Sequence, residues 1–144
     1  MSRIGQGRFR AYSAGSFPKK SVHPGALELL TTIGLPTQGL HPKSWDEFAR
    51  PSSPPLDFVI TLCDSIHGEA CPVWSGKTVT AFWGIPDPAA VPDEPKEVAT
   101  AFATVAKQMK ARLDLFLALP LATLDRMSLQ AKTRAIHWQA DNPD

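Results

Sequence analysis

Asp57-Phe58-Val59-Ile60-Thr61-Leu62 is the stretch that decides the fold class, and Cys63 follows it directly. A compact run of apolar and β-branched residues such as this one is typical of a strand that is buried on both faces of a parallel sheet. Residues 78–83 (Thr-Val-Thr-Ala-Phe-Trp) predict a second strand with a more alternating pattern. The aromatic-rich residues 8–13, which end at a Gly-containing turn, predict a short third strand.

Helical patterns alternate with these strands. Pro24 begins a run of apolar residues at helical spacing that stops at Gly34, so a helix is expected over residues 24–33. The hydroxyl-x-x-Glu pattern of residues 44–47 is that of a capping box, and it predicts one helical turn through Ala49.

The strongest helical periodicity covers residues 94–119, where apolar side chains recur at steps of three and four and acidic side chains gather near the start. Pro120 ends this helix. Residues 121–138 predict a further, weaker helix, followed by a frayed tail over residues 140–144. Strands alternating with helices predict an α/β layer fold with a parallel sheet.

Composition and charge narrow the classes of function. The chain has 144 residues, 43% of them hydrophobic, which predicts one domain. A net charge of +1 gives no electrostatic case for nucleic acid or an anionic membrane as a partner. No apolar run approaches the roughly 20 residues of a membrane span, and none follows the basic N-terminus as in a signal peptide. Two cysteines do not make a disulfide scaffold, so the expected location is the cytoplasm.

The two cysteines are the first candidates for chemistry. Cys63 lies just past the carboxyl end of a predicted strand, which is where sites collect in open α/β sheets. Cys71 follows eight residues later, beyond Gly68. The alternative is that both are small buried apolar residues, because free cysteine is among the most buried residue types.

Their spacing argues against a shared metal ion and constrains a disulfide. On a helix, Cys63, His67 and Cys71 would share one face, but the two cysteines would lie roughly 12 Å apart along the axis. That is too far for both to bind one tetrahedral zinc unless the segment bends. A disulfide, which needs Cα atoms about 4.4–6.8 Å apart, would require a helical segment to unwind, with Gly68 as the expected hinge.

Asp87 is the second candidate. It follows the predicted strand of residues 78–83, and Pro86 and Pro88 flank it and restrict its backbone. A carboxyl group held in place beside a reaction centre suits general-acid catalysis. Asp-Pro is also a common turn signal, so a purely structural role is the alternative.

These residues occur together with other motifs that run in the order of one family. The motifs cover residues 12–16 (Tyr-Ser-Ala-Gly-Ser), 23–30 (His-Pro-Gly-Ala-Leu-Glu-Leu-Leu), 43–48 (Lys-Ser-Trp-Asp-Glu-Phe), 57–64 (Asp-Phe-Val-Ile-Thr-Leu-Cys-Asp), 68–74 (Gly-Glu-Ala-Cys-Pro-Val-Trp) and 82–89 (Phe-Trp-Gly-Ile-Pro-Asp-Pro-Ala). Over about residues 8–129 the chain resembles the thiol-dependent arsenate reductases built on the low-molecular-weight protein tyrosine phosphatase fold. The resemblance implies a flavodoxin-like, three-layer α/β fold with a parallel sheet.

The chain departs from this family at its front. The family begins with a buried strand, a Cys-x5-Arg phosphate-binding loop and a helix, whereas residues 1–7 would match only the end of that helix. No Cys-x5-Arg occurs in the sequence, because the sixth residue after Cys63 is Glu69 and the sixth after Cys71 is Lys77. We therefore expect one N-terminally truncated domain over residues 1–144, without the first strand and phosphate loop and with a C-terminal helical extension over residues 121–144.

The rest of the family's thiol relay carries over to this chain. In the family the loop thiolate attacks arsenate, and the Asp matching Asp87 protonates the leaving oxygen. The Cys matching Cys63 then attacks the first Cys, and the Cys matching Cys71 resolves that bond. Thioredoxin or a similar thiol reductant reopens the resulting disulfide. No cofactor and no metal are expected, and the resemblance gives Ser13 a supporting role beside the loop.

Three functions therefore stay open. The first is arsenate reductase, inactive or incomplete as this chain unless translation starts upstream. The second is a non-catalytic redox or thiol-partner remnant that keeps Cys63 and Cys71. The third is a phosphotyrosine phosphatase-like protein, although a plain phosphatase has no use for this cysteine pair. A missing strand would expose sheet edges and apolar surface, so a homodimer is also expected.

Overall fold

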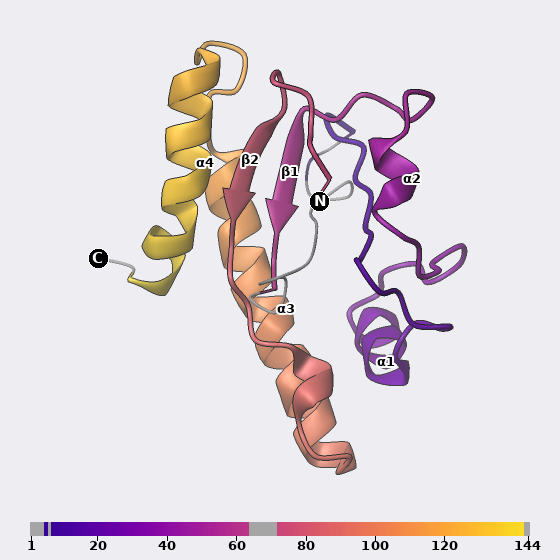
Figure 1. Ribbon diagram of the computed structural model, residues 1–144. Helices are drawn as coiled ribbons and strands as arrows, with labels where there is room; N and C mark the ends of the chain where they lie inside the picture. Colours follow the sequence, from indigo (N-terminus) through magenta and orange to yellow (C-terminus); the bar gives the residue numbers. More distant parts are fainter. Residues whose placement is uncertain (1–4, 6, 64–71, 143–144) are drawn as a thin grey trace.

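The computed structural model describes residue 5 and residues 7–63 and 72–142 of the chain. Its elements follow in the order α1 (Pro24–Thr32), α2 (Asp46–Ala49), β1 (Phe58–Thr61), β2 (Val79–Phe82), the 3-10 helix η2 (Pro88–Ala90), α3 (Pro95–Leu117) and α4 (Arg126–Asp141). Within these residues β1 and β2 form a parallel sheet with Phe58 opposite Val79. Helix α3 crosses behind the strands and α4 lies along the outer side of β2 (Figure 1). The predicted α/β fold with a parallel sheet is confirmed.

The core forms where β2 meets α3 and α4. It consists of four buried side chains, with relative exposures of 7% or less: Ala81, Trp83, Phe116 and Ile136. The Phe116 ring lies in edge contact with Phe58 of β1, at a centroid separation of 4.9 Å, and with Trp83, at 5.9 Å. Phe116 of α3 therefore contacts both β1 and the residue that directly follows β2.

Helix α4 covers the outer edge of β2 with side chains. Arg126, Gln130 and Arg134 recur every four residues, so they share one face of the helix. Arg126 donates to the carbonyl of Thr78 (3.4 Å), and Arg134 donates to the carbonyl of Thr80 (3.0 Å). The Gln130 side-chain oxygen accepts from the N–H of Thr80 (3.4 Å). These bonds satisfy backbone groups that a neighbouring strand would otherwise satisfy.

The predicted strand over residues 8–13 does not form. An isolated parallel bridge forms only two residues beyond this stretch, between Gly15 and Ser44. The stretch does contact the core through Phe9, whose ring lies 5.6 Å from that of Phe116. A strand is defined by its ladder of hydrogen bonds, and no strand in the described residues runs alongside this one. The alternating sequence pattern alone could not supply that partner.

The two strands also differ from the sequence expectation in burial. β1 was expected to be buried on both faces, but all four of its residues are only half-buried. Strand β2 is the better covered, with Val79 and Ala81 buried. The difference follows from position, because β2 lies between β1 and α4 whereas β1 pairs only with β2 among the described strands.

The helices largely follow the sequence prediction. α1 ends within a residue of its predicted C-terminus, α2 is the expected single turn, and α3 ends at Leu117, before Pro120. The side chain of Ser44 accepts a hydrogen bond from the N–H of Asp46 (3.2 Å), but the N-cap of α2 is Trp45, so the predicted capping box does not form. None of the helices in the described part of the chain has the length and apolar character needed to cross a bilayer.

The last helix begins later and ends later than predicted. It begins at Arg126 rather than residue 121, because the Asp125 side chain caps it by accepting from the N–H (2.9 Å) and hydroxyl (3.0 Å) of Ser128. These hydrogen bonds hold the pKa of Asp125 below its ordinary value. They therefore stabilise the folded state when the pH is above the ordinary pKa of an aspartate, and this stabilisation is lost as the pH falls through the lowered pKa. The helix continues to Asp141, inside the predicted frayed tail, because Arg112 binds that carboxylate at 2.8 Å.

We expect Trp83→Phe to be strongly destabilising. The indole N–H of Trp83 donates to the Thr133 carbonyl at 2.8 Å, and both residues are fully buried. The substitution removes buried volume and the hydrogen bond from the indole N–H, which should cost about 2–4 kcal/mol of unfolding free energy. Urea denaturation followed by far-UV circular dichroism measures the change.

The matched control is Trp138→Phe in α4, where the indole is 69% exposed. This change should alter the unfolding free energy by about 0.5 kcal/mol or less. Equal effects of the two substitutions would contradict the role given to the Trp83 hydrogen bond.

Candidate functional site

The carboxyl ends of β1 and β2 are joined by backbone hydrogen bonds that extend past the strands. Trp83 donates its N–H to the Thr61 carbonyl (2.8 Å), and Ile85 donates to the Leu62 carbonyl (2.9 Å). Cys63 is the next residue after Leu62, and Asp87 comes two residues after Ile85. The segments that carry Cys63 and Asp87 therefore both begin at the carboxyl-terminal edge of the parallel sheet. In open α/β folds, binding and catalytic sites form at this edge.

Cys63 is half-buried at this edge. Cys71, and His67 with it, lie outside the described residues, so the predicted cysteine pair and the metal alternative stay predictions. Among the residues that the structure describes, no three His, Cys, Asp or Glu side chains come together in a way that could hold a metal ion.

Asp87 is exposed, and it caps the short helix η2. Its Oδ1 accepts a hydrogen bond from the N–H of Ala89 at 2.9 Å. This contact is the turn role that an Asp-Pro sequence predicts. It also fixes the direction of the carboxyl group, so the same geometry suits a positioned proton donor.

The segment between β2 and Asp87 is anchored by a buried arginine of α3. Arg112 is 2% exposed, and its guanidinium donates to the Gly84 carbonyl (3.4 Å) and to the Asp141 carboxylate (2.8 Å). It thereby ties α4 to the chain that leads to Asp87. The sequence prediction did not include Arg112, although its charged side chain falls on the otherwise apolar face of residues 94–119.

Gly84 itself lies where a side chain has no room. A Cβ at this position would come within 2.8 Å of the Phe82 ring and 3.4 Å of the His137 ring. The Phe82 and His137 rings contact each other at 5.5 Å between centroids. The turn that leads to Asp87 is therefore packed directly against α4.

Two other residues from the sequence motifs have structural contacts. His23 caps α1, since its Nδ1 accepts the N–H of Gly25 at 3.0 Å. Ser13 is exposed, and its carbonyl accepts from the Lys43 ammonium at 3.2 Å, in a contact that links two loops. The described residues place no anion-binding group around Ser13 beyond this lysine.

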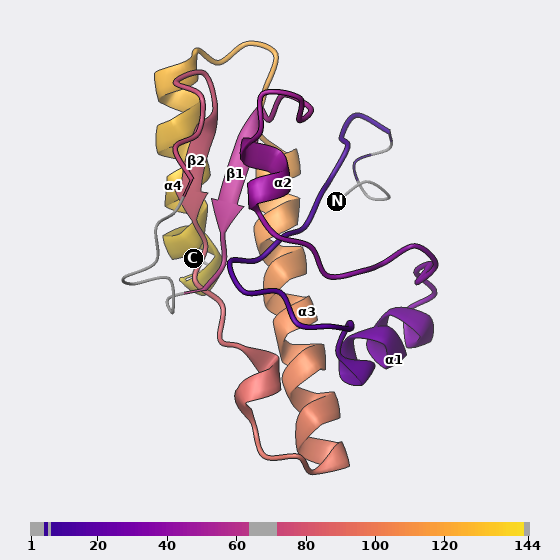
Figure 2. The ribbon, with the colours of Figure 1, turned by 45° about the vertical axis from the view of Figure 1, so that its right-hand side comes forward.

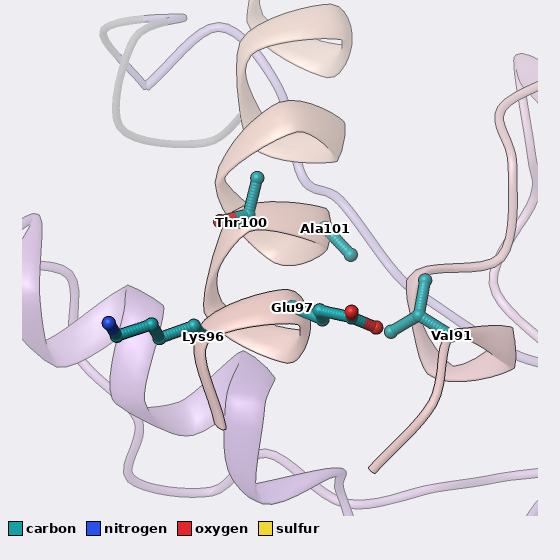
Figure 3. A pocket seen from close by; sticks show the side chains of 5 residues that line it. All are labelled: Val91, Lys96, Glu97, Thr100 and Ala101. Atoms are coloured by element: carbon teal, nitrogen blue, oxygen red, sulfur yellow. The ribbon is translucent and has the colours of Figure 1, made fainter. Parts of the chain in front are cut away.

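A hollow lies near this edge but does not contain the candidate residues. It is open to solvent, and it lies between η2 and the first turns of α3, where Glu97 points toward Val91 and Lys96 extends to the other side (Figure 3). Thr100 and Ala101 complete its lining. Neither Cys63 nor Asp87 lines it, so it gives no evidence for a substrate pocket at the sheet edge.

Comparison with models of protein families gives a match. A family model for low molecular weight phosphotyrosine protein phosphatase matches residues 1–133. None of the curated proteins that were compared matches the chain.

We expect Gly84→Ala to destabilise the protein by about 1–3 kcal/mol, because the added methyl group overlaps the Phe82 ring. In a Phe82→Leu background the same substitution should cost much less, since the ring is gone. Unfolding free energies of the two single variants and the double variant measure this coupling.

The control is Gly76→Ala, where a Cβ meets no atom within 4 Å. It should change the unfolding free energy by about 0.5 kcal/mol or less. Additive effects of Gly84→Ala and Phe82→Leu would show that the ring does not limit this turn.

Proposed function

Because the chain belongs to the low molecular weight phosphotyrosine protein phosphatase family, we propose that it carries the disulfide-forming part of an arsenate-reducing thiol relay. This family of α/β flavodoxin-like proteins includes phosphatases and arsenate reductases. In the proposal Cys63 and Cys71 supply two electrons as they form a disulfide, and Asp87 donates a proton to the departing oxygen of arsenate.

The observation that carries the proposal is the joined edge of the two strands. The hydrogen bond from Ile85 to Leu62 brings the chain at Cys63 and the chain that leads to Asp87 to one side of the sheet. A thiol that acts on a covalent intermediate and the acid that helps to form that intermediate need such a common edge. Hydrolysis of a phosphate ester uses one thiolate and one acid, so it would leave the pair of Cys63 and Cys71 without a role.

The proposed reaction balances in three steps. A thiolate bonds to arsenic, and one arsenate oxygen leaves as water after protonation by Asp87. The Cys63 thiolate then attacks that first sulfur, the sulfur–arsenic bond breaks, and its electron pair stays on arsenic, which is reduced from As(V) to As(III). The Cys71 thiolate attacks the Cys63 sulfur, which frees the first thiol and leaves one disulfide.

The first thiolate is neither of the two cysteines of this chain. A cysteine of a Cys-x5-Arg loop has an arginine six residues after it. The residue at that position is Glu69 for Cys63 and Lys77 for Cys71. The proposal therefore assigns to these 144 residues the acid and the second and third thiols. A dithiol reductant of the thioredoxin class is the proposed partner, and the reducing cytoplasm is the proposed location.

Phosphotyrosine hydrolysis is the second candidate, because the family description names it and Asp87 could protonate a leaving phenol in the same position. It needs the same absent loop for its nucleophile. A non-catalytic redox protein that keeps the cysteine pair is the third, and it shares the disulfide with the first proposal.

Mild oxidation of the 144-residue chain with diamide should form one intramolecular disulfide, seen by mass spectrometry as the loss of two hydrogens. Thioredoxin, thioredoxin reductase and NADPH should then reduce it with consumption of one NADPH per chain. Cys63→Ser and Cys71→Ser should each abolish this consumption, and Asp87→Asn should leave it unchanged, because the acid takes no part in disulfide exchange.

Arsenate added to the reduced chain should cause no sustained NADPH consumption, since no loop thiolate is present to start the cycle. Failure of oxidation to form the intramolecular disulfide would overturn the relay. Hydrolysis of para-nitrophenyl phosphate by a Cys63→Ser, Cys71→Ser variant of a form of the protein extended upstream to include a Cys-x5-Arg loop would support the phosphatase instead.

A further inference from the structure

The chain that leads into β2 carries a fully exposed apolar side chain. Val73 is 97% exposed, and among the described residues no other large hydrophobic side chain is as exposed. Single apolar residues on a surface are normal, but Val73 is followed by Trp74, and both line the same hollow. Figure 2 shows this chain on the other side of the two strands from α3, so that helix does not cover it.

The hollow beside Val73 is small. Phe48, Leu56 and the prolines of residues 54–55 line it together with Val73 and Trp74. Its volume is about 170 Å³. A pocket for a drug-sized molecule has roughly 300–1,000 Å³. The hollow therefore suits a single side chain of a partner protein better than a free small molecule.

The hydroxyl groups in the lining have partners within the chain. Ser53 donates its hydroxyl to the Phe48 carbonyl (2.8 Å), and Thr78 donates its hydroxyl to the Leu56 carbonyl (2.8 Å). A hydroxyl has one proton to donate, so neither group can donate to a ligand as well. Arg50 is the one charged residue of the lining, and it is exposed to solvent. The interior of the hollow therefore offers a partner mainly apolar contact.

The position of Val73 in the chain decides which partner reaches this surface. Only Pro72 separates it from Cys71, so the Cα atoms of Val73 and Cys71 lie at most about 7 Å apart. In the proposed relay a dithiol reductant attacks the disulfide of Cys63 and Cys71, whose two sulfur atoms are about 2 Å apart. Whichever sulfur is attacked, the reductant is bonded close to Val73 at that moment.

We propose that the reductant docks on Val73 and places one apolar side chain in the hollow beside it. This inference rests on the proposed thiol relay, and it adds the surface by which the partner is recognised. The partner is a small protein whose attacking cysteine lies in an apolar surface, because that surface has to cover Val73. Burial of a valine side chain between two proteins should favour their complex by about tenfold or more.

The reduction that this contact assists balances in two steps. The first thiolate of the reductant bonds to one sulfur of the disulfide and releases the other sulfur as a thiolate. The second thiol of the reductant then breaks this mixed disulfide and forms the reductant's own disulfide. Two electrons and two protons pass from the reductant to Cys63 and Cys71.

Reduction of the oxidised 144-residue chain by thioredoxin and by dithiothreitol separates docking from chemistry. Val73→Asp should lower the rate constant with thioredoxin about tenfold, because a charge replaces the apolar contact. The rate with dithiothreitol should stay unchanged, since a small dithiol needs no docking surface. Ala49→Trp, which fills the hollow, should also slow thioredoxin alone. Val73→Ile should keep both rates. Alkylation of quenched samples and mass spectrometry measure them.

The matched control is Met127→Asp in α4, where the side chain is 80% exposed. It introduces the same charge at an exposed apolar residue that does not line the hollow, so both rates should stay unchanged. Because Val73 is 97% exposed, its substitution should leave the fold intact, and far-UV circular dichroism checks this.

Three outcomes would overturn the docking proposal alone: an unchanged rate of Val73→Asp with thioredoxin, equal slowing with both reductants, or equal slowing by Met127→Asp. In each of these cases the disulfide still forms, so the relay stands. A chain that forms no disulfide on oxidation overturns the relay, and the docking surface with it.

Discussion

Strand β2 depends on hydrogen bonds from the side chains of α4. A strand at the edge of a sheet exposes unpaired N–H and C=O groups, and burying them without partners would be unfavourable. Arg126, Gln130 and Arg134 meet these groups because helical spacing of four residues brings them to one face. The same helix buries Ile136 in the core, so packing and polar contacts hold α4 in one position.

The contacts between α4 and β2 also hold the candidate site in place. Trp83 follows β2 directly, and its buried indole is bonded to α4 through the Thr133 carbonyl. Arg112 then ties the next residue, Gly84, to α3 and to the end of α4. The chain that reaches Asp87 is thus supported by both long helices. Among the described elements, no helix contacts β1 in the way that α4 contacts β2.

Much of the fold could be predicted because its signals are local. The β-branched run before Cys63 and the apolar periodicity after Glu94 each specify an element through near neighbours in the chain, and both elements form. Residues 8–13 carry a comparable strand pattern, but a strand also needs a partner from a distant part of the sequence. The sequence predicted that Cys63 and Asp87 lie at the edge of the sheet. It did not predict the hydrogen bond from Arg112 to the Gly84 carbonyl, because these two residues are 28 positions apart in the chain.

The sequence by itself determined the α/β class, the α3 helix, the parallel pairing of two strands, and the residues able to do thiol and acid chemistry. It also shows directly that these 144 residues contain no Cys-x5-Arg pattern. Only the tertiary structure decided which strand edge α4 covers. That outcome depends on where α4 docks against β2, and docking is set by contacts between residues about 50 positions apart, such as Trp83 with Thr133.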